Sequence, residues 1–264
     1  MTNITWLVVL GLINLLLLGV GLLVFVPRAA LKLPLAKVFK NLNDNMLSLL
    51  IIIGIVGIHL LEVNIIDPQT TAWVGTDFTG AIYHIEGDAV LWFTQHWVPA
   101  LVSFFVIMYI AVYSFTLWFS PAYFLLTNDK RALKTLAYGF AVIYAIALPF
   151  YLFLPITNVY TYYNISSALE QTIPTVEQFF YSTTTQNNCL PSLHVAMTIL
   201  VAWSVRLTGN KKFTMFAYFC MISVIFSVIY LGIHWIIDVI CGALVAVVAI
   251  VIVRYVVKEG ATHD

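Results

Sequence analysis

Charged residues are scarce in this chain. Only 9% of its 264 residues are Asp, Glu, Lys or Arg, against about 25% in soluble domains, whereas 62% are hydrophobic. This composition excludes an ordinary soluble domain and indicates a membrane protein with several spanning helices. The formal net charge is zero, so nothing in the charge balance points to a nucleic-acid partner.

Cysteine is scarce as well. Cys189, Cys220 and Cys241 are an odd number of thiols without close spacing, which predicts neither a disulfide framework nor a set of metal ligands. We therefore expect no metal and no cofactor. The first hydrophobic run lacks a basic leader and a small-residue cleavage site, so we expect it to remain as a helix.

The hydrophobic runs predict an all-α, polytopic membrane bundle of about seven helices, because a span needs about 20 residues. No polar insertion is large enough for a soluble domain, so residues 1–264 are expected to form a single integral membrane domain. The expected spans are 4–26, 46–61, 97–119, a fourth that ends near 154, 191–207, a sixth that ends near 230, and a seventh that runs from a break at Gly232 to about 257.

Two long polar segments separate these spans. Residues 62–96 are acidic and contain helix breakers such as Asp67-Pro68, so we expect a loop with a short interfacial helix near 78–85. Residues 155–190 are rich in Tyr, Thr and Asn and are expected to form the second loop. The fifth span is expected to start at Pro191, because proline is favoured in the first turn of a helix.

The basic residues predict the orientation. With seven spans, all twelve Lys and Arg residues fall on the same side of the membrane, which the positive-inside bias makes the cytoplasm. The N-terminus and both long loops are then outside and the C-terminus is cytoplasmic. His194, which begins the fifth span, and His234, which begins the seventh, are expected to share the extracytoplasmic face.

His234 and Asp238 are four residues apart in a predicted helix, so their side chains can pair. A carboxylate at membrane depth is costly and marks either a functional site or a buried pair. Pairing would hold one tautomer of the imidazole, as a nucleophilic or basic histidine requires. The alternative is a pair that only ties two helices together.

Ser192 and His194 lie in the first turn of the fifth predicted span. A helix N-terminus presents N–H groups that bind anions, so a phosphate is a plausible ligand of this turn. The alternative is that Ser192 merely caps the helix and His194 is an interfacial residue. The presence of both motifs on one side of the membrane favours a catalytic site.

Together, Pro191-Ser192-Leu193-His194 and Ser227 with His234 and Asp238 resemble two signatures of the type 2 phosphatidic acid phosphatase (PAP2) superfamily of lipid phosphatases and phosphotransferases. The family patterns are Pro-Ser-Gly-His, and Ser-Arg, five residues, His, three residues, Asp. The resemblance implies a six-helix core over residues 44–258, preceded by an extra helix and basic connector in 1–43. It also implies that His234 attacks phosphorus to give a phosphohistidine, that Asp238 orients it, and that His194 protonates the leaving alkoxide.

The chain lacks one glycine and the basic residues of the family patterns. Leu193 replaces the glycine, Val228 replaces the arginine, and the first signature, a Lys and an Arg-Pro near the end of the fourth span, has no basic residue here. Basic groups usually hold phosphoryl charge, so we expect polar groups to bind the substrate instead: Ser192, Asn187, Asn188, Thr157, Asn158, Tyr160 and Tyr230.

The pattern is nearest the inositol-phosphorylceramide-synthase-like branch, which moves phospho-head groups between lipids. Such phosphodiesters carry one charge fewer than monoesters, which favours a transferase with a phospholipid substrate and an alcohol or water acceptor. A lipid-phosphate or polyprenyl-phosphate phosphatase is the first alternative, and a non-catalytic lipid-binding or transport protein is the second. The histidines and acids of the first loop, including His59 and Glu62, match no metal-ligand pattern and are interpreted as part of a solvated loop.

Overall fold

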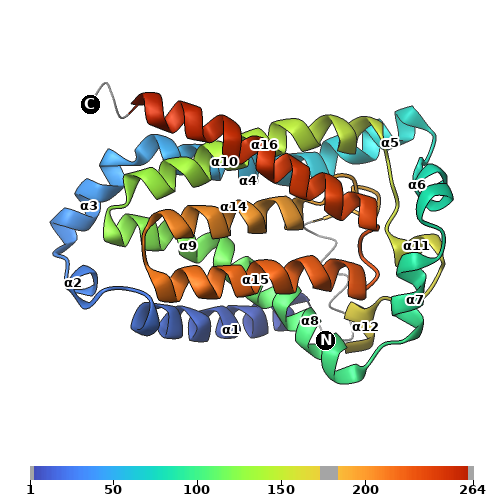
Figure 1. Cartoon of the computed structure of the whole chain (residues 1–264), viewed down its shortest axis with the longest axis horizontal. Helices are drawn as coiled ribbons and strands as arrows, with labels where there is room; N and C mark the ends of the chain where they lie inside the picture. Colours follow the sequence, from blue (N-terminus) through green and yellow to red (C-terminus); the bar gives the residue numbers. More distant parts are fainter. Residues whose placement is uncertain (1–2, 173–183, 261–264) are drawn as a thin grey trace.

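A computed structural model describes residues 3–172 and 184–260, and every regular element in these two ranges is helical. Figure 1 shows a bundle of long helices with a group of short helices at one end. The elements are α1 (Asn3–Val24), α2 (Arg28–Leu31), α3 (Leu35–Asp44), α4 (Met46–Leu61), η1 (Glu62–Ile66), α5 (Asp67–Val74), α6 (Thr79–Glu86), α7 (Ala89–Gln95), α8 (Pro99–Ile107), η2 (Met108–Val112), α9 (Tyr113–Thr127), α10 (Lys130–Phe153), α11 (Val159–Tyr162), α12 (Ala168–Thr172), α14 (Leu193–Leu207), α15 (Lys211–Tyr230) and α16 (Ile236–Gly260).

Helix α14 forms the centre of the bundle and packs against α9, α10, α15 and α16. Its side chains Leu200 and Val201 are buried in a large apolar core. Large apolar side chains also cover the outside of the bundle, among them Leu23 (83% exposed) and Phe226 (61%). Apolar residues both in the core and on the outer surface are what a bundle surrounded by lipid requires.

Five helical segments among the described residues are long and apolar enough to span a membrane: Met46–Val74, Pro99–Thr127, Lys130–Phe153, Lys211–Tyr230 and Ile236–Val257. The sequence predicts seven spans. The first and fifth expected spans correspond to shorter apolar helices, Val8–Val24 and Leu193–Leu207. Helix α14 has 15 residues and is therefore about 22 Å long, less than a hydrocarbon core of about 30 Å.

The expected end of the second span at Leu61 is wrong. The helix continues through the π-helical turn η1 into α5 and ends at Val74, where Gly75 adopts a left-handed conformation. Pro68 is the second residue of α5, which directly follows the π-helical turn η1. Residues 62–74, expected as loop, are therefore helical, and the short helix expected near 78–85 is α6.

Three other boundaries differ from the predictions. The third span continues to Thr127 with Pro121 inside the helix. Helix α14 begins at Leu193, not at Pro191, because the Ser192 N–H donates to the Asp238 carbonyl and its backbone stays extended. His234 precedes α16 instead of lying within it.

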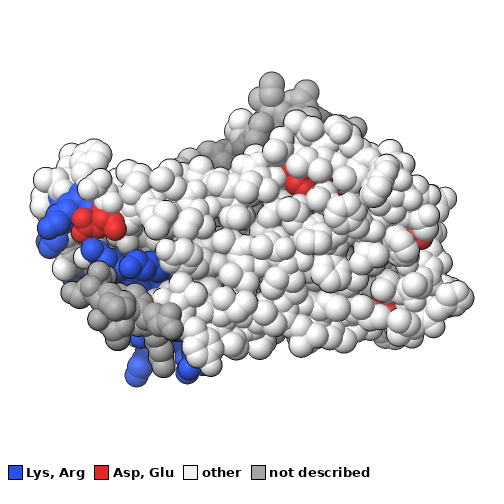
Figure 2. Space-filling view, turned by 90° about the horizontal axis from the view of Figure 1, so that it is seen from above, with Lys and Arg blue, Asp and Glu red and all other residues white. Residues whose placement is uncertain are grey.

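The two ends of the bundle differ in charge. The visible Lys and Arg residues gather at the end that holds α2 and α3, which we call the basic end (Figure 2). There Lys130 Nζ lies 3.1 Å from Asp44 Oδ2. Helices α6, α7, α11 and α12 and the N-terminus lie at the opposite end, the loop end (Figure 1). The turns that precede α14 and α16 also face the loop end.

Candidate active site

Two segments of the loop end run side by side and form one edge of the site. Ile156 N–H donates to the Asn187 carbonyl (2.8 Å), and Asn158 N–H donates to the Gln186 carbonyl (2.8 Å). Ile156 and Asn188 form an isolated parallel bridge. This pairing connects the residues that follow α10 with the residues that lead into α14.

The turns before α14 and α16 bring His194 and His234 together. Their ring centroids are 6.2 Å apart, and the hydrogen bond from Ser192 N–H to the Asp238 carbonyl (3.0 Å) ties the two turns to each other. Two histidines separated by forty positions therefore face one site.

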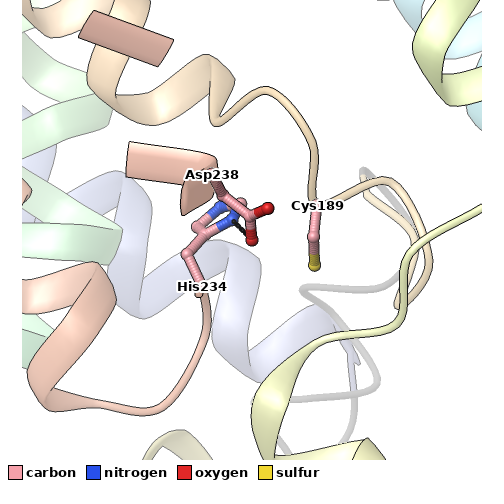
Figure 3. Close-up of side chains that lie close together, drawn as sticks. All are labelled: Cys189, His234 and Asp238. Atoms are coloured by element: carbon pink, nitrogen blue, oxygen red, sulfur yellow. Dashed lines mark hydrogen bonds and ion pairs between the residues drawn. The ribbon is translucent and has the colours of Figure 1, made fainter. Parts of the chain in front are cut away.

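Asp238 lies directly behind the His234 ring (Figure 3). Its Oδ2 is 3.3 Å from His234 Nδ1 and accepts a hydrogen bond from Trp235 N–H at 2.9 Å. The second contact is a helix cap, in which the side chain at the third helical position reaches back to the N–H that precedes the helix. The Asp238 carboxylate thus caps the N-terminus of α16 and contacts His234 Nδ1. The other ring nitrogen of His234, Nε2, is therefore the one that can contact a reacting atom.

Glu86, which lies on α6, also caps the N-terminus of α16. Its carboxylate oxygens accept hydrogen bonds from Ile236 N–H (2.9 Å) and Ile237 N–H (2.5 Å). Burial raises the pKa of Glu86, although these two hydrogen bonds oppose the shift. The N-terminal N–H groups of α16 are therefore engaged by protein carboxylates. The sequence offered no signal for this pairing beyond an acidic residue in a long loop.

Aromatic side chains fix His194 and its turn. The His194 ring lies between Tyr109 and Tyr113, with centroid distances of 4.5 and 4.7 Å. Tyr151 donates a hydrogen bond to the Pro191 carbonyl at 2.5 Å. The hydroxyl of Ser192 is buried and makes no hydrogen bond within the described part of the chain, and Ser192 is not among the residues that line the histidine cavity.

Both histidines line a cavity of about 500 Å³ that has a polar and an apolar part. The polar lining includes His59, Glu62, Asn158, Asn188, His194 and His234. The apolar lining comes from α1, α4, η2 and α9 and includes Leu10, Ile55, Val56, Leu60, Ile110 and Leu117. No Lys or Arg is among the described residues that line it.

Residues 82–252 match the family model of the PAP2 superfamily. The chain belongs to this superfamily. Its members are generally phosphatases or phosphotransferases. The PAP2 match contains both histidine motifs and begins within α6, so α1 to α5 precede it. Neither the curated proteins nor the solved structures include a match to the chain.

The residues expected to replace the PAP2 cations are divided between several places. Asn158 and Asn188 line the histidine cavity, and Ser192 lies behind it. Thr157 and Asn187 line a separate hollow of about 440 Å³, where they bond to Asp77 and Thr71, respectively.

Two expected binding tyrosines are engaged away from the cavity. Tyr160 is buried in an apolar cluster and its N–H donates to the Gly232 carbonyl. The Tyr230 hydroxyl accepts a hydrogen bond from Val98 N–H at 2.8 Å. Tyr160 thus contacts the turn between α15 and α16, Tyr230 contacts the start of α8, and neither is among the residues that line the histidine cavity.

Sequence reasoning missed His59 and Glu62, which it assigned to a solvated loop. Because the helix continues through η1, both residues face the cavity, and the Glu62 side chain is fully buried. His59 and Glu62 are three residues apart, a spacing that places two side chains on one face of a helix. This spacing is informative only if the helix extends past Leu61.

The ligand atoms of Cys189, His234 and Asp238 lie within 4.8 Å of one another, which fits the size of a metal site (Figure 3). The protonation state of Cys189 does not favour a metal. Its thiol donates to the Ile233 and Gln186 carbonyls, and burial raises its pKa well above the usual value. Metal binding requires a thiolate, so we interpret Cys189 as a packing residue behind the His234–Asp238 pair.

Proposed function

We propose that this PAP2 protein transfers a phosphoryl or phospho-head group from a phospholipid to an alcohol or water, through a phosphohistidine on His234. The observation that carries the proposal is an asymmetric pair of imidazoles in one cavity. The two rings are 6.2 Å apart, but only His234 has a carboxylate, Asp238, at its Nδ1.

The first step follows from this asymmetry. His234 Nε2 attacks phosphorus, an N–P bond forms, and the P–O bond to the lipid alcohol breaks. Protonated His194 donates its proton to the leaving oxygen and becomes neutral. Asp238 stabilises the Nδ1–H of His234 as that ring gains positive charge.

The second step reverses the proton transfer. An acceptor hydroxyl approaches the phosphohistidine, and neutral His194 removes its proton. The acceptor oxygen bonds to phosphorus, the N–P bond breaks, and both histidines return to their starting states. His234 is thus the nucleophile of the first step and the leaving group of the second, and the proton that His194 gives up in the first step is regained from the acceptor in the second.

The lining of the cavity supports a phospholipid diester as the substrate. Its apolar part, between α1, α4 and α9, suits acyl chains, and its polar part suits a head group. The described lining lacks Lys and Arg and includes the carboxylate of Glu62, which disfavours the second negative charge of a phosphomonoester. We infer from this a head-group transferase like those of the inositol-phosphorylceramide-synthase-like branch.

The distribution of charge supports an extracytoplasmic site. The histidines lie toward the loop end, opposite to the basic end, and a membrane protein keeps its basic segments in the cytoplasm. The C-terminus, which lies at the basic end in Figure 1, is then cytoplasmic.

The test uses purified protein with a phospholipid labelled in its phosphate, in the presence and absence of an alcohol acceptor. We expect label in a new lipid and, after acid-free quenching, label on the protein. His234→Ala should remove both signals, whereas His194→Ala should slow turnover by about 10²- to 10⁴-fold. Release of inorganic phosphate from monoesters without an exchange product would instead identify a phosphatase. Full turnover by both variants would exclude catalysis by this site.

A further inference from the structure

The apolar wall of the histidine cavity reaches the outer surface of the bundle on α4. Val56 and Leu60 line the cavity, yet they are 54% and 42% exposed. Ser114 on α9 also lines the cavity and is exposed. A side chain that lines a cavity and is about half exposed stands at its rim. The cavity therefore opens sideways, between helices that are long and apolar enough to span a membrane.

The opening lies between α1 and α4, which are held by different parts of the bundle. Helix α1 packs on η2 and α9, and α4 packs on α10, but among the described residues α1 and α4 are not a closely packed pair. Leu10 of α1 and Ile55 of α4 nevertheless line the same cavity. In the most apolar stretch of Met46–Val74, 11% of the residues are buried, against 39–44% in the other four candidate spans. Helix α4 is therefore the span most exposed to lipid.

Toward the basic end, α1 closes against α9. Trp118 Nε1 donates a hydrogen bond to Asn14 Oδ1 at 2.9 Å. Farther along α1, a Cβ added at Gly21 would lie 2.8 Å from the ring of Phe119, so the two helices touch there. A lipid tail in the cavity is thus blocked between α1 and α9 and has its way out on the side of α4.

The apolar wall is shorter than a lipid tail. On η2 and α9 it runs from Ile110 to Leu117, which is about 10 Å along a helix. An acyl chain that crosses one leaflet extends about 15 Å, half of a hydrocarbon core of about 30 Å, and a diacyl phospholipid has two such chains. A cavity of about 500 Å³ therefore suits the head group and the upper part of the tails, and the rest of the tails must lie outside it.

We propose that the acyl tails of the substrate leave the cavity between α1 and α4, over Val56 and Leu60, and end in the bilayer. The inference rests on the proposed function and adds the path of the tails to it. This path allows a lipid to reach the histidines without bringing its tails into water, where exposed apolar surface is costly. Both helices precede the region that matches the family model, residues 82–252.

The test narrows the opening with a large side chain at its rim. Val56→Trp and Leu60→Trp should each raise the KM for a lipid with tails that cross a leaflet by about 10- to 100-fold, the range expected when an apolar site is overpacked. The KM for the same head group on tails of about six carbons should change little, because such tails fit beside a wall of about 10 Å. The kcat for the short-tailed lipid should stay close to that of the wild type, because the histidines are not altered.

Ile58→Trp is the matched control. Ile58 lies on the same helix and is similarly exposed (44%), but it is not among the residues that line the cavity. Its substitution should leave both KM values unchanged. Val56→Ala widens the rim and should not raise the KM for the long-tailed lipid. Thermal unfolding and gel filtration identify any variant that fails to fold, and the two rim positions provide independent variants.

The outcomes separate this inference from the function on which it rests. Wild-type KM values for the long-tailed lipid in the folded rim variants, with label still trapped on His234, would overturn the path and leave the function standing. Equal rises in KM for long and short tails would place the effect on the head group and would also contradict the path. If the wild type gives no turnover that depends on His234, the function fails and this inference fails with it.

Discussion

Asp238 connects the folding of α16 with the chemistry proposed for His234. One oxygen of its carboxylate contacts both His234 Nδ1 and Trp235 N–H, while the other, Oδ1, is buried and has no partner within the described residues. An amide at this position could still cap the helix, because its oxygen accepts the Trp235 bond. The same oxygen would still face His234 Nδ1, but an amide carries no negative charge.

We therefore expect Asp238→Asn to fold but to lose about 10²- to 10⁴-fold in kcat, because a neutral amide does not stabilise the positive charge that the His234 ring gains in the proposed first step. Kinetics of head-group transfer and thermal unfolding measure the two effects. Asp129→Asn is the matched control, because Asp129 Oδ1 caps α10 through Ala132 N–H (2.9 Å) at the basic end. Equal losses of activity in the two variants would contradict the role of Asp238.

Ser192 offers a second test at this scale. Its hydroxyl is buried and has no hydrogen-bond partner among the residues that the structure describes, and the same holds for the hydroxyl of Ser204 in α14. Removing an unsatisfied buried hydroxyl costs little stability, so Ser192→Ala and Ser204→Ala should both unfold at or above the wild-type temperature. Only Ser192→Ala should lose activity, by about tenfold for one hydrogen bond. An unchanged kcat/KM in Ser192→Ala would exclude the hydroxyl from binding.

The sequence predicted the residues with diagnostic spacing and missed those placed by tertiary structure. The His234–Asp238 pair and its proximity to His194 followed from spacing and from the side of the membrane. The positions of Asn158 and Asn188 in the cavity, and of Thr157 and Asn187 outside it, depend on backbone pairing between segments about thirty residues apart. No local pattern encodes that pairing.

At the scale of elements, α16 packs directly on the turn that carries Ser192 and His194. An added Cβ at Gly242 would lie 2.5 Å from the Ser192 carbonyl oxygen. That carbonyl accepts the Ala196 N–H bond of the first turn of α14, so it cannot move without moving the turn. The absence of a side chain at this position allows the two helices to approach closely.

Gly242→Ala should therefore destabilise the fold by about 1–3 kcal/mol, the usual cost of overpacking, and should lower kcat by displacing His194 relative to His234. Gly54→Ala on α4 is the control, because its Cβ would meet nothing within 4 Å and helix propensity favours alanine. Denaturation and transfer assays of the two variants make the comparison. A Gly242→Ala protein with wild-type stability would contradict the close packing.

Glu86 allows a test of how α6 attaches to α16. The pKa of this carboxyl is raised in the folded state from an ordinary value of 4.5, so the folded protein holds the proton more tightly than the unfolded chain does. The resulting stabilisation is complete at low pH and is lost as pH rises through the folded pKa. The unfolding temperature of the wild type minus that of Glu86→Gln should therefore fall as pH rises above the ordinary value of 4.5. A flat or rising difference would contradict burial of Glu86 against α16.

The helices were predicted more reliably than their ends. The hydrophobic runs located every long helix, because length and composition determine a span. The boundaries failed at Pro68 and Pro191, where proline was interpreted as a helix breaker or a helix start, and at Phe119, the expected end of a helix that continues through Pro121. The actual effect of a proline depends on which neighbouring N–H and C=O groups have other partners, and these lie elsewhere in the chain.

At the scale of the whole molecule, the separation of charge predicts which end faces which compartment. A membrane-impermeant maleimide should label His84→Cys on α6 from outside intact cells or right-side-out vesicles. Lys40→Cys on α3 should react only after the membrane is opened. The parent protein measures the background from Cys189 and Cys220, which are buried, and Cys241, which is partly buried. Labelling in the reverse order would place the histidines on the cytoplasmic side.

The cavity is lined by residues from two stretches of the chain, one that matches the PAP2 family model and one that precedes the match. The histidines and Asp238 belong to the stretch that matches the superfamily, whereas Leu10, Ile55, His59 and Glu62 come from the preceding segment. The proposed catalytic residues thus lie in the matched stretch, whereas the apolar wall of the cavity comes partly from the preceding segment and partly, through Ile110 and Leu117, from the matched stretch. Exchange of the first eighty residues between relatives should therefore change which lipid the enzyme accepts and leave the proposed catalytic residues intact.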